Sequence, residues 1–492
     1  MSQVEVLPAP VSSNLYINDT LSRVRAVEKL PWAASGSPIL ASPLAERKSA
    51  EEAGDDVAIP GLPPVHRGHT DIHLREGVMR AAELAADGEP DAEKAFFVAD
   101  LSYVYMQHER WMRNLPEVQP FYAVKCNPDP YVLRLLAGLG AGFDCASNGE
   151  IANVLGTGIV DSSRIIYANP CKAVSHLKQA NAAGVDLMTF DNADELHKVA
   201  RVHSGARLVL RILTDDSKAL CRLGLKFGAP LSAVPGLLAK ARELGLNVVG
   251  ISFHVGSGNY DATVFSDAVS RARAAFDMGR DAGYRFSLLD IGGGFEDATF
   301  EATAADLRSA IQQYFPDRSG LKIIAEPGRY YVARAFSLAA NIIARRASAE
   351  GSEAPPAPVD PVGDEQPTVM YYINEGVYGA FNCIMFDHQV VHPRVLALGG
   401  SFHVPADVAA DTRTASVWGP TCDSIDCVSP TTRLPSALAV GDWLAFDNMG
   451  AYTVCAASQF NGFALSTVVY TTGGGQGAAE TRRVLAGLAG AL

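Results

Sequence analysis

Two patterns of hydrophobic and polar positions divide the chain. Between residues 95 and 335, short apolar, β-branched runs alternate with longer Ala- and Leu-rich stretches of helical spacing. This alternation is typical of parallel strands joined by helices, and eight such units predict an α/β fold, a (β/α)8 TIM-like barrel. A doubly wound open sheet is the alternative. The eight runs are 121–125, 141–145, 164–168, 186–190, 208–212, 248–254, 286–291 and 322–325.

After residue 340 the apolar runs are short and closely spaced, with turn residues between them. This spacing predicts a separate C-terminal antiparallel β domain over 336–492. Its expected strands are 369–373, 394–398, 414–418, 442–446, 452–456 and 465–471. An acidic, proline-rich stretch at 351–367 is expected to be a disordered insert.

Two segments precede the predicted barrel. Residues 1–65 are rich in Pro, Ala, Ser and Glu with little periodicity, which predicts a mobile extension. A lead-in segment, 66–95, is expected to join the β domain. The barrel itself is assigned to 96–335, opened by a strand-like run at 95–100.

Composition narrows the class of protein. The 492 residues are 48% hydrophobic and carry a net charge of −13 without a basic stripe, which argues against a nucleic-acid partner. The eight cysteines are scattered, which suits a reducing compartment better than a disulfide framework. No apolar run approaches the roughly 20 residues of a membrane span, and no secretory signal is visible. We therefore expect a cytoplasmic protein without a membrane partner.

One lysine ends the first strand run. In Phe-Tyr-Ala-Val-Lys125-Cys-Asn-Pro, the run stops at Lys125, and Asn-Pro then predicts a turn. A lysine in an apolar site is deprotonated more easily, and the neutral amine can attack a carbonyl. Our hypothesis is that Lys125 holds pyridoxal phosphate as a Schiff base. The alternative is a lysine whose stem lies along apolar surface while its ammonium stays in water.

Polar residues recur at the carboxyl ends of the predicted barrel strands, which is where barrel enzymes carry their active sites. Each could be a structural polar group, but so many at one rim favour a site. They are Lys125, Asp144, Arg211, His254, the glycines Gly292, Gly293 and Gly294, and Glu326.

Three short motifs suggest what this rim binds. The triple glycine after a strand can bring backbone amides close to a phosphate, although it could also be a flexible turn. Glu326-Pro-Gly-Arg329 offers a second phosphate site and a carboxylate for a pyridine nitrogen, which would make the ring an electron sink. His254 could stack on such a ring and Ser257 could bind its phosphate. A lone histidine is more often structural, and no ligand lies at metal spacing, so no metal is expected.

The predicted β domain adds further candidates. Cys422 and Asp423 lie in a tight turn, and Asp387 lies in a second loop. Two carboxylates are suited to binding the distal ammonium of a substrate. The common alternative for Cys422 is a small buried hydrophobe.

Together, these motifs resemble the eukaryotic ornithine decarboxylases, which belong to the alanine-racemase-like, fold type III class of pyridoxal phosphate enzymes. The resemblance covers about 95–470 and rests on nine segments: FYAVKCN, GFDCAS, LTDDSKALCRLGLKFG, ISFHVGSG, DIGGGF, AEPGRYYVA, EGVYGAFNCIMFDH, VWGPTCDSID and DNMGAYT. It implies a barrel plus a β domain, and decarboxylation of L-ornithine to putrescine and CO2, the first step of polyamine biosynthesis.

The resemblance also assigns roles to residues. Lys125 would form the Schiff base, Glu326 would pair with the pyridine nitrogen and His254 would stack on the ring. Cys422 would protonate the substrate carbon after CO2 leaves. The phosphate would be held by Ser257, Gly294, Gly328, Arg329 and Tyr452, with Gly292 and Gly293 in the same loop. Asp144, Glu150 and Arg211 would surround the ring, and Tyr378, Asp387 and Asp423 would line the substrate pocket.

The resemblance implies a head-to-tail homodimer with shared active sites. Cys422 and Asp423 would come from the other subunit, and Lys226 and Asp426 would form an ion pair across the interface. A minor lysine decarboxylation is expected, because lysine is one methylene longer than ornithine, a difference that contributes only about 1–3 kcal/mol of discrimination. The alternative function is a catalytically inactive, antizyme-binding regulatory homologue. The segment 173–196 resembles the antizyme-binding part of animal enzymes only weakly, so antizyme is a possible partner that the sequence does not support.

Overall fold

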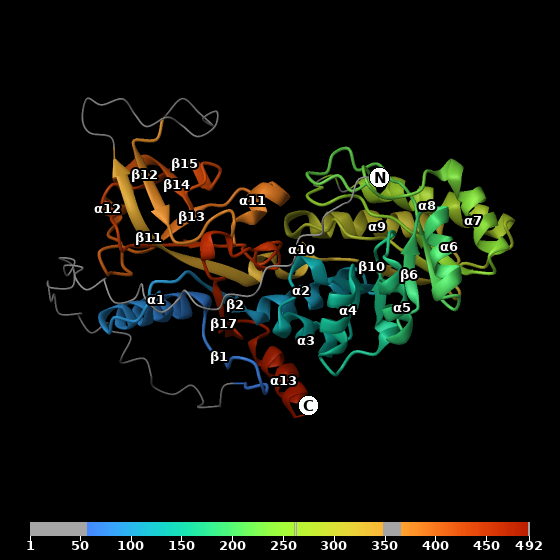
Figure 1. Ribbon diagram of the computed structural model, residues 1–492, viewed down its shortest axis with the longest axis horizontal. Helices are drawn as coiled ribbons and strands as arrows, with labels where there is room; N and C mark the ends of the chain where they lie inside the picture. The colour runs from blue at the N-terminus through green and yellow to red at the C-terminus, as the bar shows by residue number, and fades with distance from the viewer. Residues whose placement is uncertain (1–56, 260, 262, 348–365, 491–492) are drawn as a thin grey trace, which may run out of the picture. The chain divides into compact units, whose positions relative to one another are not determined.

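The computed structural model describes residues 57–259, 261, 263–347 and 366–490, and Figure 1 shows their arrangement. Eight parallel strands form a closed barrel in the order β10-β3-β4-β5-β6-β7-β8-β9. The predicted barrel is therefore confirmed, and the open-sheet alternative is wrong. The strands are β3 (Val118–Ala123), β4 (Gly142–Cys145), β5 (Ile165–Tyr167), β6 (Leu187–Phe190), β7 (Arg207–Arg211), β8 (Asn247–Ser252), β9 (Leu288–Asp290) and β10 (Lys322–Ala325).

Amphipathic helices follow the barrel strands and bury their apolar faces against them. Several begin at a side chain that accepts backbone N–H groups of the first turn: Asp129, Ser147 and Asn192 cap α3, α4 and α6 in this way. The helices of this region are α2 (Leu101–Asn114), α3 (Pro130–Gly138), α4 (Asn148–Leu155), α5 (Val174–Ala182), α6 (Ala193–Val202), α7 (Val234–Glu243), α8 (Val264–Asp281), α9 (Phe300–Tyr314) and α10 (Arg329–Val332).

A nine-stranded sheet forms the second domain. Its main path is β1-β17-β2-β11-β12-β14-β15, with β16 pairing β11 and β13. Most of its pairs are antiparallel, but β1–β17, β17–β2 and β12–β14 are parallel. The strands are β1 (Val65–His66), β2 (Phe96–Asp100), β11 (Phe336–Ala347), β12 (Val369–Ile373), β13 (Pro393–Ala397), β14 (Thr412–Trp418), β15 (Cys427–Pro435), β16 (Trp443–Phe446) and β17 (Thr467–Thr471).

Three further helices lie outside the barrel, α1 (Thr70–Ala86), α11 (Asn382–Asp387) and α12 (Ala406–Ala410), and the last helix, α13 (Ala478–Ala489), packs against α2 and α3. None of the helices in the described ranges is long and apolar enough to cross a membrane.

Three boundaries differ from the sequence prediction. The run that was expected to open the barrel, β2, instead pairs with β11 and β17 in the sheet, so the barrel begins after residue 96. The expected strand at 452–456 is wrong: Tyr452 has a φ of 55° and a 3-10 turn, Val454–Ala456, follows it. The backbone at Tyr452 contacts the barrel: its N–H donates a hydrogen bond to the Cys126 carbonyl oxygen at 2.9 Å.

The third boundary is the end of the predicted mobile extension, residues 1–65, which was placed too far along the chain. Val57 pairs with Val65, and Ile59 is buried with them in the core, so the segment from residue 57 onward is packed. The remainder of that extension, residues 1–56, and most of the expected insert, 351–365, lie outside the described residues.

Candidate active site at the carboxyl end of the barrel

Lys125 lies just beyond β3, at the carboxyl end of the barrel. It is in a one-turn 3-10 helix, Val124–Cys126, and not in the strand itself as the sequence predicted. Its ammonium forms an ion pair and hydrogen bond with Asp144 at the end of β4. Asp144 is fully buried, and its second oxygen, Oδ1, has no hydrogen-bond partner among the described residues. Two neighbouring strands thus bring an amine and a carboxylate together, with one carboxylate oxygen still able to accept a hydrogen bond.

The expected apolar, easily deprotonated amine is not what the structure shows. Burial alone would lower the pKa of Lys125, but the charge and hydrogen bond of Asp144, with smaller contributions from Tyr452 and Glu326, outweigh burial and raise it. Before a ligand arrives, the ammonium form is therefore favoured. The amine becomes nucleophilic only when it gives up a proton, and Asp144 is the nearest carboxylate.

Asp290, the last residue of β9, and Glu326, which follows β10, are buried carboxyl groups that interact with each other. Asp290 Oδ1 accepts the Gly292 N–H at 2.9 Å. Burial raises the pKa of Asp290 to about 7, and burial together with the charge of Asp290 raises that of Glu326 well above its ordinary range. Because two like charges at this spacing repel each other, the pair retains a proton.

The imidazole of His254 lies in the loop after β8, and burial, with Arg211 and Lys125 nearby, holds its pKa well below the ordinary value. Its Nδ1 accepts the Gly256 N–H at 3.0 Å, which leaves Nε2 protonated in the neutral ring. A methyl group on Gly293 would lie 2.7 Å from that Nε2. The histidine is therefore a neutral, flat ring held in a fixed orientation beside the glycine loop.

The triple-glycine loop tolerates no side chains. A Cβ on Gly292 would lie 2.0 Å from the Phe253 carbonyl oxygen, and one on Gly294 would lie 2.6 Å from that of Gly256. Both glycines have positive φ, +64° and +105°. The loop is thus packed directly against the backbone after β8.

We call the set Ser257, Gly294, Gly328, Arg329 and Tyr452 the phosphate cup. Arg329 begins α10, is mostly buried, and lies over the Tyr452 ring with its guanidinium carbon 5.3 Å from the ring centre. Its Nη2 is paired with Asp387 from α11, so two expected ligand-binding residues are bonded to each other. Its Nε has no hydrogen-bond partner in the described chain and lies 3.5 Å from a Glu296 oxygen.

Two of the expected residues are not brought to Lys125. Cys422 is exposed and Asp423 is half-buried in the turn after β14. Asp423 accepts the Tyr378 hydroxyl at 2.5 Å, which lowers the Asp423 pKa, and Tyr378 stacks on Phe460. Within the described chain, none of the hydrogen bonds or ion pairs of Cys422 and Asp423 reaches Lys125.

Asp426 has a role that sequence reasoning missed. It is buried and accepts the Val377 N–H at 2.8 Å and the Thr421 hydroxyl at 2.6 Å. Its carboxylate therefore organises the turn that carries Cys422. The ion pair expected between Asp426 and Lys226 of a second subunit remains a prediction.

Comparison with known proteins identifies one family for this chain. The model of the pyridoxal-dependent decarboxylase pyridoxal-binding domain matches residues 101–333. An ornithine decarboxylase of Schizosaccharomyces pombe is 52% identical over 386 residues, which span 78% of this chain and 85% of that protein. The chain belongs to the ornithine decarboxylase family of pyridoxal-dependent decarboxylases.

Other members of this family, and one solved structure, widen the comparison. A protein named antizyme inhibitor 2, from Xenopus laevis, is 51% identical over 411 residues, spanning 82% of this chain and 87% of that one. The crystal structure of the Paramecium bursaria Chlorella virus arginine decarboxylase bound to agmatine has a TM-score of 0.71 at 33% identity and covers 80% of this chain and all of that one.

The residues present fit the cofactor of this family, pyridoxal phosphate. The glycine loop has no room for side chains, and two buried polar atoms, Arg329 Nε and Asp144 Oδ1, have no hydrogen-bond partner among the described residues. Lys125 would hold the cofactor, the phosphate cup its phosphate, and Glu326 its ring nitrogen.

Two residues of this decarboxylase site were not predicted as site residues. Cys221 lies in the loop after β7, exchanges backbone hydrogen bonds with Ser257, and directs its thiol at Asp387, 3.5 Å away. Glu296 lies two residues beyond the triple glycine. Position after a strand end was the available signal for Glu296, whereas nothing local in the sequence identifies Cys221.

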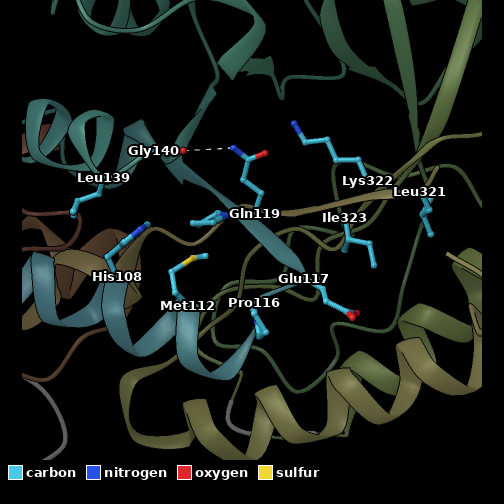
Figure 2. A pocket seen from close by; sticks show the side chains of 11 residues that line it. His108, Met112, Pro116, Glu117, Gln119, Leu139, Gly140, Leu321, Lys322 and Ile323 are labelled. Atoms are coloured by element: carbon cyan, nitrogen blue, oxygen red, sulfur yellow. Dashed lines mark hydrogen bonds between the residues drawn. The ribbon is translucent and has the colours of Figure 1, made fainter. Parts of the chain in front are cut away.

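The barrel has a separate cavity of about 320 Å³ at its opposite, amino-terminal end. Figure 2 shows side chains from α2, the start of β3 and the start of β10 around it, with Gln119 directed at the Gly140 carbonyl. Lys322 and Glu117 are its charged lining residues. Because the cavity lies at the strands' amino ends, it is distinct from the Lys125 site.

Proposed function

We propose that this decarboxylase removes CO2 from L-ornithine to give putrescine, the first step of polyamine biosynthesis. The observation that carries this proposal is the Lys125–Asp144 pair at the carboxyl end of a barrel whose residues 101–333 match the pyridoxal-binding model. The 52% sequence identity to a protein named ornithine decarboxylase supports the choice of substrate.

Pyridoxal phosphate, when bound, supplies a conjugated ring that accepts the electron pair left at the substrate's α-carbon as CO2 departs. Glu326 would keep a proton at the ring nitrogen, and the charge of its partner Asp290 raises the Glu326 pKa. The neutral ring of His254 offers a flat face for stacking without competing for that proton. Lys125 anchors the cofactor, and its Nζ exchanges a proton with Asp144.

The β domain supplies the residues that recognise the substrate and return a proton. Asp387 and Asp423 would bind the distal ammonium of ornithine, with Tyr378 fixing Asp423 by a hydrogen bond of 2.5 Å. Cys422 would donate its Sγ proton to the α-carbon. Because lysine differs by one methylene, discrimination of about 1–3 kcal/mol leaves a minor lysine activity.

The decisive experiment measures CO2 release from ornithine, lysine and arginine side by side with the same purified protein. We expect ornithine to have the highest kcat/KM, lysine to follow by roughly one to two orders of magnitude, and arginine to be inactive. Lys125→Ala is expected to abolish turnover, and Cys422→Ala to reduce kcat by about 100-fold or more. Lysine or arginine as the best substrate would contradict the proposal.

A regulatory, non-catalytic role is the second candidate, because a protein named antizyme inhibitor 2 is as similar to this chain as the named decarboxylases are. The presence of Lys125, Glu326, Arg329, Cys422 and Asp423 favours catalysis. Visible absorbance of the purified protein that borohydride abolishes would support the enzyme. A colourless protein that gains no absorbance with added cofactor would support the regulator.

A further inference from the structure

Glu296 is a buried carboxylate beside the phosphate cup, and none of the roles given above uses it. It lies between the triple-glycine loop and a short 3-10 turn, Asp297–Thr299, and is 8% exposed. A carboxylate this buried needs hydrogen bonds or an opposite charge to compensate for lost water. Its two partners therefore indicate why it is there.

Both partners of Glu296 belong to the elements that form the cup. Its Oε1 accepts the Gly258 N–H at 3.1 Å, in the loop that also carries Ser257. The same oxygen lies 3.5 Å from Arg329 Nε. Among the described residues, this N–H has no hydrogen-bond acceptor. One carboxylate oxygen thus connects three segments: the loop after β8, the loop after β9, and the first residue of α10.

Arg329 is held from two sides by acids. Asp387 pairs with the terminal Nη2, and Glu296 faces the inner Nε. A phosphate that approaches the guanidinium competes with Asp387 for the terminal nitrogens, while Nε remains oriented by Glu296. Planar guanidinium groups bind oxyanions best when their plane is fixed in advance. The Glu296 contact fixes that plane without occupying the terminal donors.

We propose that Glu296 is a positioning residue of the phosphate cup, which holds the Gly258 loop and the Arg329 guanidinium in place for the phosphate of the cofactor. This inference rests on the proposed placement of that phosphate at Ser257, Gly294 and Arg329. Loss of the Glu296 oxygen leaves the Gly258 N–H without its acceptor and lets Arg329 turn toward Asp387.

The test measures binding by the full-length protein after its cofactor has been removed. Dissociation constants are determined for pyridoxal phosphate from visible absorbance and for inorganic phosphate by competition. Glu296→Ala is expected to weaken both by about tenfold or more, as loss of a hydrogen bond to a charged group implies. Glu296→Gln keeps an oxygen for the Gly258 N–H and is expected to stay within about threefold of the parent protein.

Glu301→Ala is the matched control. Glu301 is also a carboxylate paired with an arginine in the same part of the chain, but it contacts Arg110 at 2.5 Å on the surface. Its removal is expected to leave both dissociation constants within about twofold, since exposed ion pairs contribute little.

Two results would overturn the proposal: a Glu296→Ala protein that binds both ligands like the parent, or a Glu296→Gln protein as weak as Glu296→Ala. If Glu296→Ala does not fold, Glu296→Asp replaces it, because its shorter side chain cannot reach both partners and should weaken phosphate binding. Parent-like binding by Glu296→Asp would then overturn the proposal. The function itself fails on a separate observation, the absence of CO2 release from ornithine by the parent protein.

Discussion

The charge state of Lys125 is governed by its neighbours more than by burial. Asp144 is in direct contact with the ammonium, and Tyr452 and Glu326 add further negative charge or dipole. The sequence suggested a neutral amine in an apolar site. Because Lys125 lies beside the carboxylate of Asp144, the charged ammonium is favoured instead. The reactive amine is therefore stored as an ion pair.

Replacing Asp144 with Asn tests this electrostatic control. The substitution removes the strongest charge that raises the Lys125 pKa, so the pKa falls and the neutral amine is more abundant at neutral pH. The neutral fraction grows about tenfold for each unit by which the pKa falls. Cofactor uptake by the cofactor-free protein, followed by visible absorbance, should accelerate at lower pH than in the parent. Glu150→Gln, which lies close by but does not touch Lys125, should move the profile less; identical profiles for Asp144→Asn and the parent would contradict this account.

Asp290 connects the site to the pH dependence of stability. Burial raises its pKa to about 7, so the folded protein keeps a proton that the unfolded chain has released. Stability contributed by this group is therefore complete at low pH and falls as pH rises through about 7. In Asp290→Asn the amide still accepts the Gly292 N–H and donates to Glu326, so this loss should disappear.

The measurement for Asp290 is urea unfolding of the cofactor-free protein at about pH 5 and at about pH 8. The parent should lose more free energy of unfolding between these values than Asp290→Asn does. Equal losses in both proteins would show that Asp290 does not retain a proton.

At the scale of elements, the glycine loop after β9 has no room for side chains. A Cβ on Gly292 would lie 2.0 Å from a backbone oxygen, at a φ of +64°. Gly292→Ala is therefore expected to destabilise the protein by more than about 3 kcal/mol and to abolish cofactor binding. Gly236→Ala, in the interior of α7 where no atom lies within 4 Å, should instead stabilise it by roughly 0.5–1 kcal/mol. Thermal or urea unfolding of both variants checks the contrast.

Most elements could be predicted because local patterns and tertiary structure agree. The barrel strands are short apolar runs followed by polar residues, and all eight were placed within a few residues of their observed bounds. The two long strands β11 and β15 were missed. The exposed half of β11 ends in Ala344-Arg345-Arg346-Ala347 and does not look like a strand, since its pairing with β12 comes from distant residues.

The site shows the same division between local and long-range information. Lys125, Asp144, His254 and Glu326 could be located because each lies within two residues of the carboxyl end of a strand. Their mutual effects could not: the pairing of Arg329 with Asp387, and of Asp290 with Glu326, depends on contacts across 58 and 36 positions that no motif records. Residue identity was thus predictable from sequence, whereas protonation state was not.

At the scale of the whole molecule, the placement of Cys422 and Asp423 raises the question of which lysine they serve. Cys422 is exposed, and the half-buried Asp423 forms hydrogen bonds with Tyr378, Thr421 and Ile425 of its own chain. Nearby, Phe460, Phe463 and Leu465 expose large apolar side chains. Apolar surface beside a reactive turn is typical of a subunit interface. We therefore propose a homodimer in which each turn completes the partner's site.

Mixing two inactive variants tests this arrangement. Lys125→Ala and Cys422→Ala each lack one essential residue, so neither homodimer should release CO2 at an appreciable rate. After subunit exchange, half of the dimers carry both changes, and one of their two sites contains only intact residues. Activity should then recover to about a quarter of the parent value, as a twofold-symmetric dimer with shared sites requires. A chain that completes its own site would show no recovery, because every site would keep one of the two defects. Mixing Lys125→Ala with Glu326→Gln is the control. Both residues lie on the same barrel, so each site of a mixed dimer keeps one of the two changes, and activity should not recover.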